Sequence, residues 1–105
     1  MIGEALKGHL DLLLLSILAN GPAHGYAVIE SLRQRSSGTF DLPEGTIYPA
    51  LHRLEKQELL SSDWTDESGR RKRIYKLTSK GRQVLGQRRG EWESFSQAVN
   101  ATIEI

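Results

Sequence analysis

The segment that most constrains the fold of this chain is residues 45–60. At the spacing of a helix it carries an apolar stripe and a separate polar stripe that includes cations. Its apolar residues Ile47, Leu51 and Leu54 follow the i, i+4, i+7 spacing of a buried helical face. Gly69 and four basic residues at 70–73 follow, in the bend between two strand-like segments. A basic hairpin directly behind such a helix is typical of a winged helix-turn-helix, so the pattern predicts a DNA-binding regulator. Polar side chains project from the rest of the helix, where they can reach phosphates or base edges: Tyr48, His52, Arg53 and Lys56.

The composition fits one small binding domain. A chain of 105 residues is near the small end of the sizes that fold alone, so a partner chain can add to its stability. The formal net charge is only +1, but residues 70–90 hold nine of the 14 Lys and Arg residues and no Asp or Glu. The local field there is therefore strongly positive.

The same composition excludes several classes of protein. The chain has no cysteine, which excludes disulfide scaffolds, thiolate zinc sites and cysteine catalysis. Its three histidines lack metal-ligand spacing, and no paired-carboxylate motif supplies a nucleophile and base. We therefore expect no catalysis, no metal and no cofactor.

An apolar run at residues 10–18 could be mistaken for a secretion signal. Asp11 interrupts this run, and Glu4 lies upstream, where a signal carries only positive charge. The run is also too short to span a bilayer. We expect a cytoplasmic protein without membrane contact.

Stop signals define the first two helices. We expect one over residues 5–19, ending at residues 20–22, where Gly can cap the helix and Pro cannot continue it. A second helix is expected over residues 24–35. Its apolar spacing places Tyr26 in the core, with a DNA contact as the alternative.

The remaining elements follow from turn and cap residues. Residues 39–42 have strand character, but the segment is very short. The third helix is expected to begin near residues 43–46, which leaves Pro49 within the first turn. Residues 60–66 and 73–78 read as the two antiparallel strands of a wing. Thr78 or Ser79 can then cap a last helix that reaches close to the C-terminus.

The last helix carries an apolar seam that indicates dimerisation. Its large residues recur at steps of three, four and seven, and the first helix has leucines outside its own stripe. The seam can simply pack in a dimer, or its aromatic residues Trp92 and Phe95 can line a site for a planar hydrophobic ligand. The residues expected in the dimer interface are Leu12, Leu15, Leu85, Trp92, Phe95, Val99 and Ile103.

The expected DNA contacts divide by what they can recognise. Wing cations should bind phosphates and add salt dependence, whereas third-helix residues are better placed to reach bases. Free backbone N–H groups at the start of the second helix could meet a phosphate. The residues expected at the DNA are Thr46, Tyr48, Pro49, His52, Arg53, Arg70, Arg71, Lys72, His24 and Gly25.

Four stretches together resemble the PadR-like transcriptional regulators of bacteria and archaea: residues 12–19, 21–26, 45–55 and 69–81. The resemblance implies a winged helix followed by a C-terminal dimerisation helix, as in the short subgroup with one such helix. It also implies that Thr46, Tyr48 and the basic wing contact DNA. In that family several members are repressors released by aromatic or multidrug-type ligands, and one subgroup uses a tryptophan of the last helix, at a position similar to Trp92. Arg88 departs from the apolar seam that the resemblance predicts.

These observations predict a fold that is mainly α with a small β-hairpin wing. Residues 1–78 form the winged-helix DNA-binding domain and residues 79–105 the dimerisation helix. The expected function is that of a homodimeric repressor on a pseudo-palindromic operator in double-stranded DNA, with a small aromatic or hydrophobic molecule as its possible effector. The alternative is a winged-helix module that binds other proteins and has no operator of its own.

Overall fold

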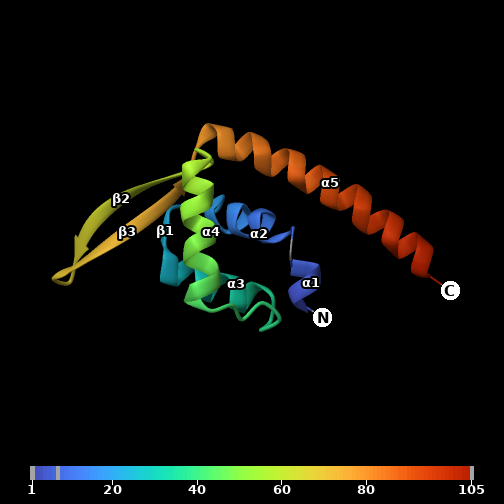
Figure 1. Ribbon diagram of the computed structural model, residues 1–105, viewed down its shortest axis with the longest axis horizontal. Coiled ribbons are helices and arrows are strands. Elements are labelled where there is room, and N and C mark those ends of the chain that lie inside the picture. Colours follow the sequence, from blue (N-terminus) through green and yellow to red (C-terminus); the bar gives the residue numbers. More distant parts are fainter. Residues whose placement is uncertain (1, 7, 105) are drawn as a thin grey trace.

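The computed structural model describes residues 2–6 and 8–104, which form five α-helices and three β-strands (Figure 1). The β2–β3 hairpin and α5 extend from a helical body in opposite directions, and the molecule measures 57 × 28 × 20 Å. The predicted fold class, mainly α with a β-hairpin wing, is confirmed. In chain order the elements are α1 (Ile2–Leu6), α2 (Leu10–Leu18), β1 (Ala23–His24), α3 (Gly25–Arg35), α4 (Glu44–Lys56), β2 (Leu60–Glu67), β3 (Arg70–Leu77) and α5 (Ser79–Ile103).

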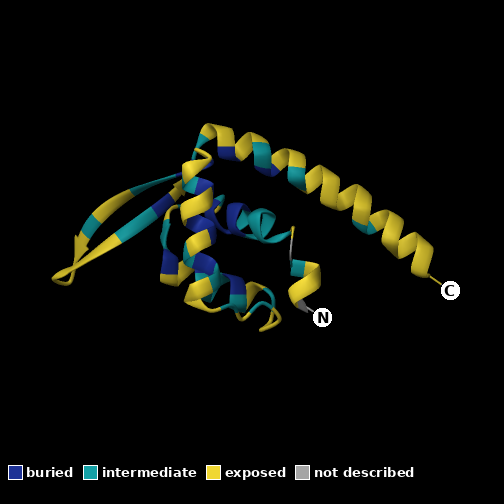
Figure 2. Cartoon of the chain, viewed as in Figure 1, coloured by how far each residue is buried: buried dark blue, intermediate teal, exposed yellow. Residues whose placement is uncertain are grey.

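The core lies between α2, α3 and α4 and is closed by the base of the hairpin and the first turns of α5 (Figure 2). The predicted apolar stripe of α4 is confirmed, because Ile47, Leu51 and Leu54 are each fully buried. Leu14 and Leu15 of α2 pack in the same cluster. Burying each such side chain contributes roughly 1.5–3 kcal/mol, so this single stripe fixes which side of α4 faces outward.

The predicted first helix is interrupted. Residues 5–19 do not form one helix, because α1 ends at Leu6 and α2 begins at Leu10. Gly8 between them has φ +98°, a left-handed conformation that stops an α-helix and that only glycine adopts without strain. The break lets the α1 segment fold back against the loop after α3 (Figure 1).

The second helix begins and ends as predicted, but its buried stripe differs. The buried residues of α3 are Gly25, Val28 and Leu32, at i, i+3 and i+7. Tyr26 follows Gly25 by one residue, about 100° around the helix, and is 64% exposed. The prediction that Tyr26 lies in the core was therefore wrong.

The third helix begins at Glu44, as expected, but Pro49 is its sixth residue and lies beyond the first turn. Pro49 cannot donate the backbone hydrogen bond that a helix makes at this position. The Pro49 ring is exposed on the side of α4 that faces away from the core, and α4 continues to Lys56. The carbonyl four residues earlier, which loses its helical hydrogen bond to Pro49, is therefore at a position where solvent can hydrogen-bond to it.

The three strands form one antiparallel sheet in the order β1-β3-β2. The predicted wing hairpin is confirmed, with Leu60 opposite Leu77 at the base and Glu67 opposite Arg70 at the tip. Its second strand begins at Arg70 and not at residue 73, so the basic residues predicted in the bend belong to β3. Residues 39–42, for which strand character was predicted, form no strand, and the third strand is instead β1 at residues 23–24. Pairing of β1 with β3 joins the start of α3 to the wing.

The last helix is anchored at its first turn. The Thr78 hydroxyl accepts a hydrogen bond from the Gly81 N–H at 2.9 Å, which confirms the predicted cap. Gly81 packs so closely on Leu59 that a β-carbon there would overlap the Leu59 carbonyl oxygen. Beyond Leu85, α5 has no buried residue in the part that the structure describes, and it leaves the body (Figure 2).

Candidate nucleic-acid interface

A groove of about 710 Å³ runs between the start of α3, the outer side of α4 and the wing. It is open to solvent, and aromatic and cationic side chains line most of it. Its lining brings together segments that are far apart in the sequence. The residues are His24, Gly25, Tyr26, Ala27, Tyr48, His52, Trp64, Arg70, Arg71, Lys72, Arg73 and Tyr75.

Tyr48 lies at the floor of this groove, against the first residue of α3. A β-carbon at Gly25 would overlap the Tyr48 ring, so glycine is required for this close approach of α3 and α4. Burial, together with the nearby Glu44 carboxylate, raises the pKa of the Tyr48 phenol above its usual value of 10.0. The hydroxyl is therefore protonated at neutral pH and can donate a hydrogen bond to an acceptor such as a phosphate oxygen.

The start of α3 faces the same groove. His24 is the N-cap residue, and no side chain caps the helix there. The first backbone N–H groups can therefore bind an anion, as at other helix N-termini. Tyr26, which is exposed, stands beside them, and sequence reasoning missed it as a site residue because it was assigned to the core. The His24 ring lies 3.5 Å from the Glu67 carboxylate, which links the start of α3 to the wing.

The wing presents its cations around an exposed tryptophan. Strand register places Trp64 opposite Arg73. The guanidinium carbons of Arg71 and Arg73 lie 4.9 and 5.3 Å from the Trp64 ring centroid, within the range of cation–π attraction. Arg70, Arg71 and Lys72 are exposed near the tip, as predicted from the sequence.

Arg73 serves a different purpose from the three residues at the tip. Its Nε donates to the Ser62 hydroxyl at 2.7 Å, and its Nη2 donates to Glu55 of α4 at 3.2 Å. The Ser62 hydroxyl also donates to the Glu55 carboxylate. These contacts connect the wing to α4 and fix their relative orientation.

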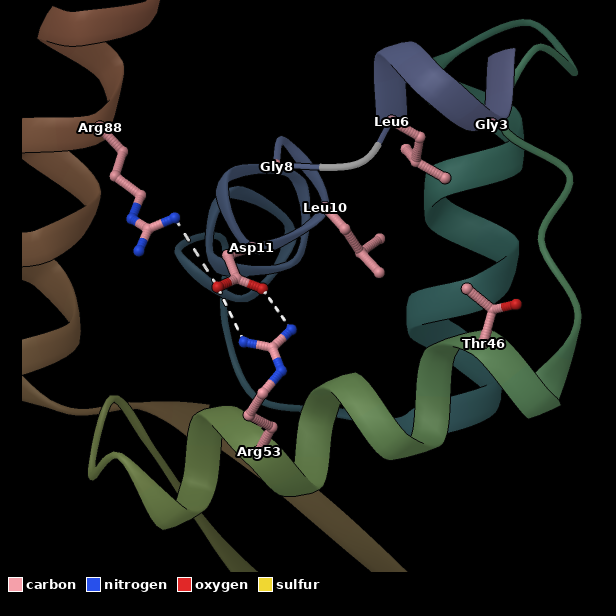
Figure 3. Close-up of a pocket in the computed structure, with 8 residues that line it drawn as sticks. All are labelled: Gly3, Leu6, Gly8, Leu10, Asp11, Thr46, Arg53 and Arg88. Carbon is pink, nitrogen blue, oxygen red and sulfur yellow. Dashed lines mark hydrogen bonds and ion pairs between the residues drawn. The ribbon is translucent and has the colours of Figure 1, made fainter. Parts of the chain in front are cut away.

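The predicted contacts of α4 divide between two sides of the helix. Tyr48 and His52 line the groove, and Pro49 is exposed beside them. Thr46 and Arg53 instead line a separate pocket of about 440 Å³, against α1, α2 and α5 (Figure 3). The structure therefore does not bring these two residues together with the rest of the predicted DNA-contacting set.

Arg53 is engaged inside the chain. Its two terminal nitrogens donate to both oxygens of Asp11 at 3.0 and 2.7 Å (Figure 3). This hydrogen-bonded carboxylate raises the pKa of the Arg53 guanidinium, which is charged at all ordinary pH values. A guanidinium that already makes a bidentate pair is poorly placed to contact a base as well.

The apolar seam of α5 is exposed over its distal half. Trp92, Phe95, Val99 and Ile103 are 43%, 56%, 36% and 67% exposed in the single chain. Trp92 also contacts the His9 ring, with centroids 5.0 Å apart in an edge-on arrangement. A stripe of this size on an otherwise polar helix is a surface on which another apolar surface can pack.

Two residues expected in the dimer interface are part of the chain's own core. Leu15 is 0% and Leu85 is 4% exposed, so neither offers a side-chain surface to a second subunit. Leu12 is only partly buried and lies beside Trp92 in a pocket of about 230 Å³. The residues that remain candidates for the dimer interface therefore lie on the distal half of α5 and the neighbouring edge of α2.

An apolar pocket of about 370 Å³ lies under Trp92. Most of its lining is apolar, which suits a hydrophobic molecule more than a charged one. Its walls come from α1, α2, the loop after α3, and α5. The lining residues are Ala5, Leu6, His9, Leu12, Leu13, Thr39, Phe40 and Trp92.

The described part of the chain holds neither a metal cluster nor a membrane span. Residues 2–6 and 8–104 contain no group of three or more His, Cys, Asp or Glu side chains placed to hold a metal ion. Within the same ranges, no helix has both the length and the apolar character needed to cross a membrane.

The helix pair α3–α4, the basic hairpin behind it and the groove between them define the winged-helix class of proteins. The family model described as the transcriptional regulator PadR-like family matches residues 14–87. This chain belongs to that family, as the sequence motifs indicated, and its members are transcriptional regulators and not enzymes.

Individual relatives agree with this assignment. The transcriptional regulator Rv3488 of Mycobacterium tuberculosis is 33% identical over 96 residues, which are 91% of this chain and 87% of the relative. A PadR family regulator from Eggerthella lenta has a solved structure that is 33% identical, with a TM-score of 0.87, covering 99% of this chain and 89% of that one. A transcriptional regulator from Clostridium thermocellum is 28% identical with a TM-score of 0.89, covering 96% and 99%.

Proposed function

We propose that this chain is a homodimeric DNA-binding repressor whose α4 helices enter successive major grooves of a pseudo-palindromic operator, about 34 Å apart. The single observation that carries the proposal is the groove between α3, α4 and the wing. A protonated phenol, a free helix N-terminus and exposed cations converge on it.

The roles of the groove residues follow from their positions. Tyr48, Pro49 and His52 lie on the part of α4 that would enter the major groove and are the candidates for base contacts. The α3 N-terminus at Gly25 and the wing cations would bind phosphates on either side. The wing cations are Arg70, Arg71 and Lys72.

DNA binding is tested with a fluorescent duplex from the region upstream of the gene that encodes this chain. Anisotropy should report saturable binding, and log Kd should rise steeply with log salt, by about 0.9 per phosphate contact. A scrambled duplex of the same length is the control. Equal affinity for both duplexes, or binding that salt does not weaken, would favour a protein-interaction module and refute the operator.

We assign dimerisation to the distal half of α5. The exposed apolar stripe from Trp92 to Ile103 lies beyond Leu85, the last buried residue of α5 in the described part of the chain, so a second α5 could bury both stripes. Phe95→Glu should convert the dimer to a monomer in sedimentation velocity. Gln97→Glu, which adds the same charge off the stripe, is the matched control.

The apolar pocket under Trp92 supports a planar hydrophobic effector. A ligand between α1, α2 and α5 would change how α5 leaves the body and thus the spacing of the two α4 helices. Titration with a panel of planar apolar compounds should quench Trp92 fluorescence and release the duplex at the same concentration. Quenching without release would make the pocket irrelevant to regulation.

A further inference from the structure

One carboxylate on α2 contacts arginines from two other helices. Asp11, whose side chain is only 14% exposed, accepts both hydrogen bonds from Arg53 of α4. The Nη1 atom of Arg88, from α5, lies 3.7 Å from the Oδ2 atom of the same carboxylate (Figure 3). Asp11 is therefore the point at which the body, the α4 helix and α5 meet.

The two arginines do not bind Asp11 equally. Arg53 donates to Oδ1 at 2.7 Å but to Oδ2 at 3.0 Å, and Oδ2 is the oxygen that faces Arg88. At 3.7 Å, Arg88 is within ion-pair distance but beyond hydrogen-bond distance. Two cations next to one anion repel each other, so any approach of Arg88 to Oδ2 weakens the hold of Arg53.

The positions of the two arginines on their helices link the direction of α5 to the rotation of α4. Arg53 lies on the flank of α4 that faces the body, while Tyr48 and His52 lie on the side of the groove. The Arg53–Asp11 pair therefore restrains rotation of α4 about its own axis. Arg88 lies four residues before Trp92, where α5 leaves the body, so a change in the direction of α5 moves Arg88 relative to Asp11.

We propose that Arg53 and Arg88 compete for Asp11, and that this shared carboxylate couples the position of α5 to the orientation of α4. Arg88 and Asp11 are then positioning residues that act on the groove without touching DNA. The effect on DNA affinity rests on the proposed function, but the coupling between α5 and α4 does not, since it is a property of the chain alone.

The first experiment needs no DNA. Hydrogen exchange of residues 44–56 is compared in Arg88→Gln and in Arg89→Gln, which removes the same charge from the next, exposed position of α5. Loss of the competing cation should slow exchange in α4 by about fivefold, the lower end of typical coupling between sites. Arg89→Gln should leave it unchanged. Equal exchange in the two variants would overturn the proposal whether or not the chain binds DNA.

The second experiment measures affinity for the labelled upstream duplex. Arg88→Gln should bind about fivefold more tightly than Arg89→Gln, and Asp11→Asn should bind more weakly than wild type. These signs are opposite to those of a simple charge effect, in which losing a cation weakens DNA binding and losing an anion strengthens it. In the Asp11→Asn background, Arg88→Gln should not increase the affinity for the duplex, because the shared carboxylate is absent.

Each outcome has a definite meaning. Variants that follow simple charge signs, or an Arg88→Gln effect that persists undiminished in the Asp11→Asn background, would refute the coupling. Slower α4 exchange in Arg88→Gln with no binding of wild type to the duplex would support the coupling and refute the proposed function. Thermal unfolding of every variant confirms that the comparison is made between folded proteins.

Discussion

Replacing Gly25 by alanine is the sharpest test of the groove geometry. A β-carbon at this position would lie 2.9 Å from Cζ and 3.0 Å from the hydroxyl oxygen of Tyr48. Favourable van der Waals contacts between such atoms begin at about 3.5 Å. The Tyr48 ring must therefore move by about 0.5 Å or more to accommodate the β-carbon. Overpacking of this kind costs about 1–3 kcal/mol, while replacing a helical glycine by alanine returns up to about 1 kcal/mol. The expected net destabilisation is therefore about 0–3 kcal/mol.

Urea denaturation of a double-mutant cycle measures this value. In the Tyr48→Ala background the clash is absent, so Gly25→Ala should become neutral or stabilising by up to about 1 kcal/mol. Gly45→Ala is the matched control, because a β-carbon at the second residue of α4 would meet nothing within 4 Å. Anisotropy should show that Gly25→Ala also weakens binding to the upstream duplex. The reasoning fails if Gly25→Ala has the same effect on unfolding whether residue 48 is tyrosine or alanine.

Three further outcomes are expected. Tyr26→Ala should change the free energy of unfolding by less than about 0.5 kcal/mol, because the ring is exposed. The same substitution should weaken duplex binding. A loss of stability several times larger would indicate that Tyr26 is a core residue. Arg71→Gln and Lys72→Gln should each reduce the salt slope of binding by about 0.9, and an unchanged slope would remove that residue from the phosphate contacts. Burial raises the pKa of Tyr75 above 10.0, so the folded state holds this proton more tightly and loses stability as pH rises beyond that value. Urea denaturation between pH 8 and pH 11 should show a smaller loss in Tyr75→Phe, and an equal loss would contradict the assignment.

Local patterns were enough to predict α4 and the wing. The stripe of Ile47, Leu51 and Leu54 is periodic within one helix, and nothing distant is needed to see which side is buried. The hairpin is also local, because its turn and strands are contiguous in the chain. Two errors arose at glycines. Gly8 interrupts the predicted first helix just before the apolar run at residues 10–18, and Gly25 belongs to the buried stripe of α3 although it has no apolar side chain.

Contacts between distant segments could not be predicted in the same way. Arg53 and Asp11 are 42 residues apart, so the sequence showed one cation on an amphipathic helix and no sign of its partner. The leucine spacing likewise placed Leu15 outside the stripe of the first helix and Leu85 in the seam of the last helix, although both side chains pack in the chain's own core cluster. Burial of an apolar residue is visible in a pattern, but the surface that covers it is not.

The orientation of α4 emerges from two such distant contacts on opposite flanks of the helix. Arg53 joins one flank to Asp11 of α2, and Glu55 joins the other to Arg73 of the wing. Each pair is partly exposed and by itself contributes little to stability, about 0–1 kcal/mol. Together they oppose rotation of α4 in either direction, because turning the helix to relax one pair stretches the other. Two arginines that a count of cations would assign to DNA, Arg53 and Arg73, therefore act inside the chain, whereas Arg70, Arg71 and Lys72 at the wing tip are exposed.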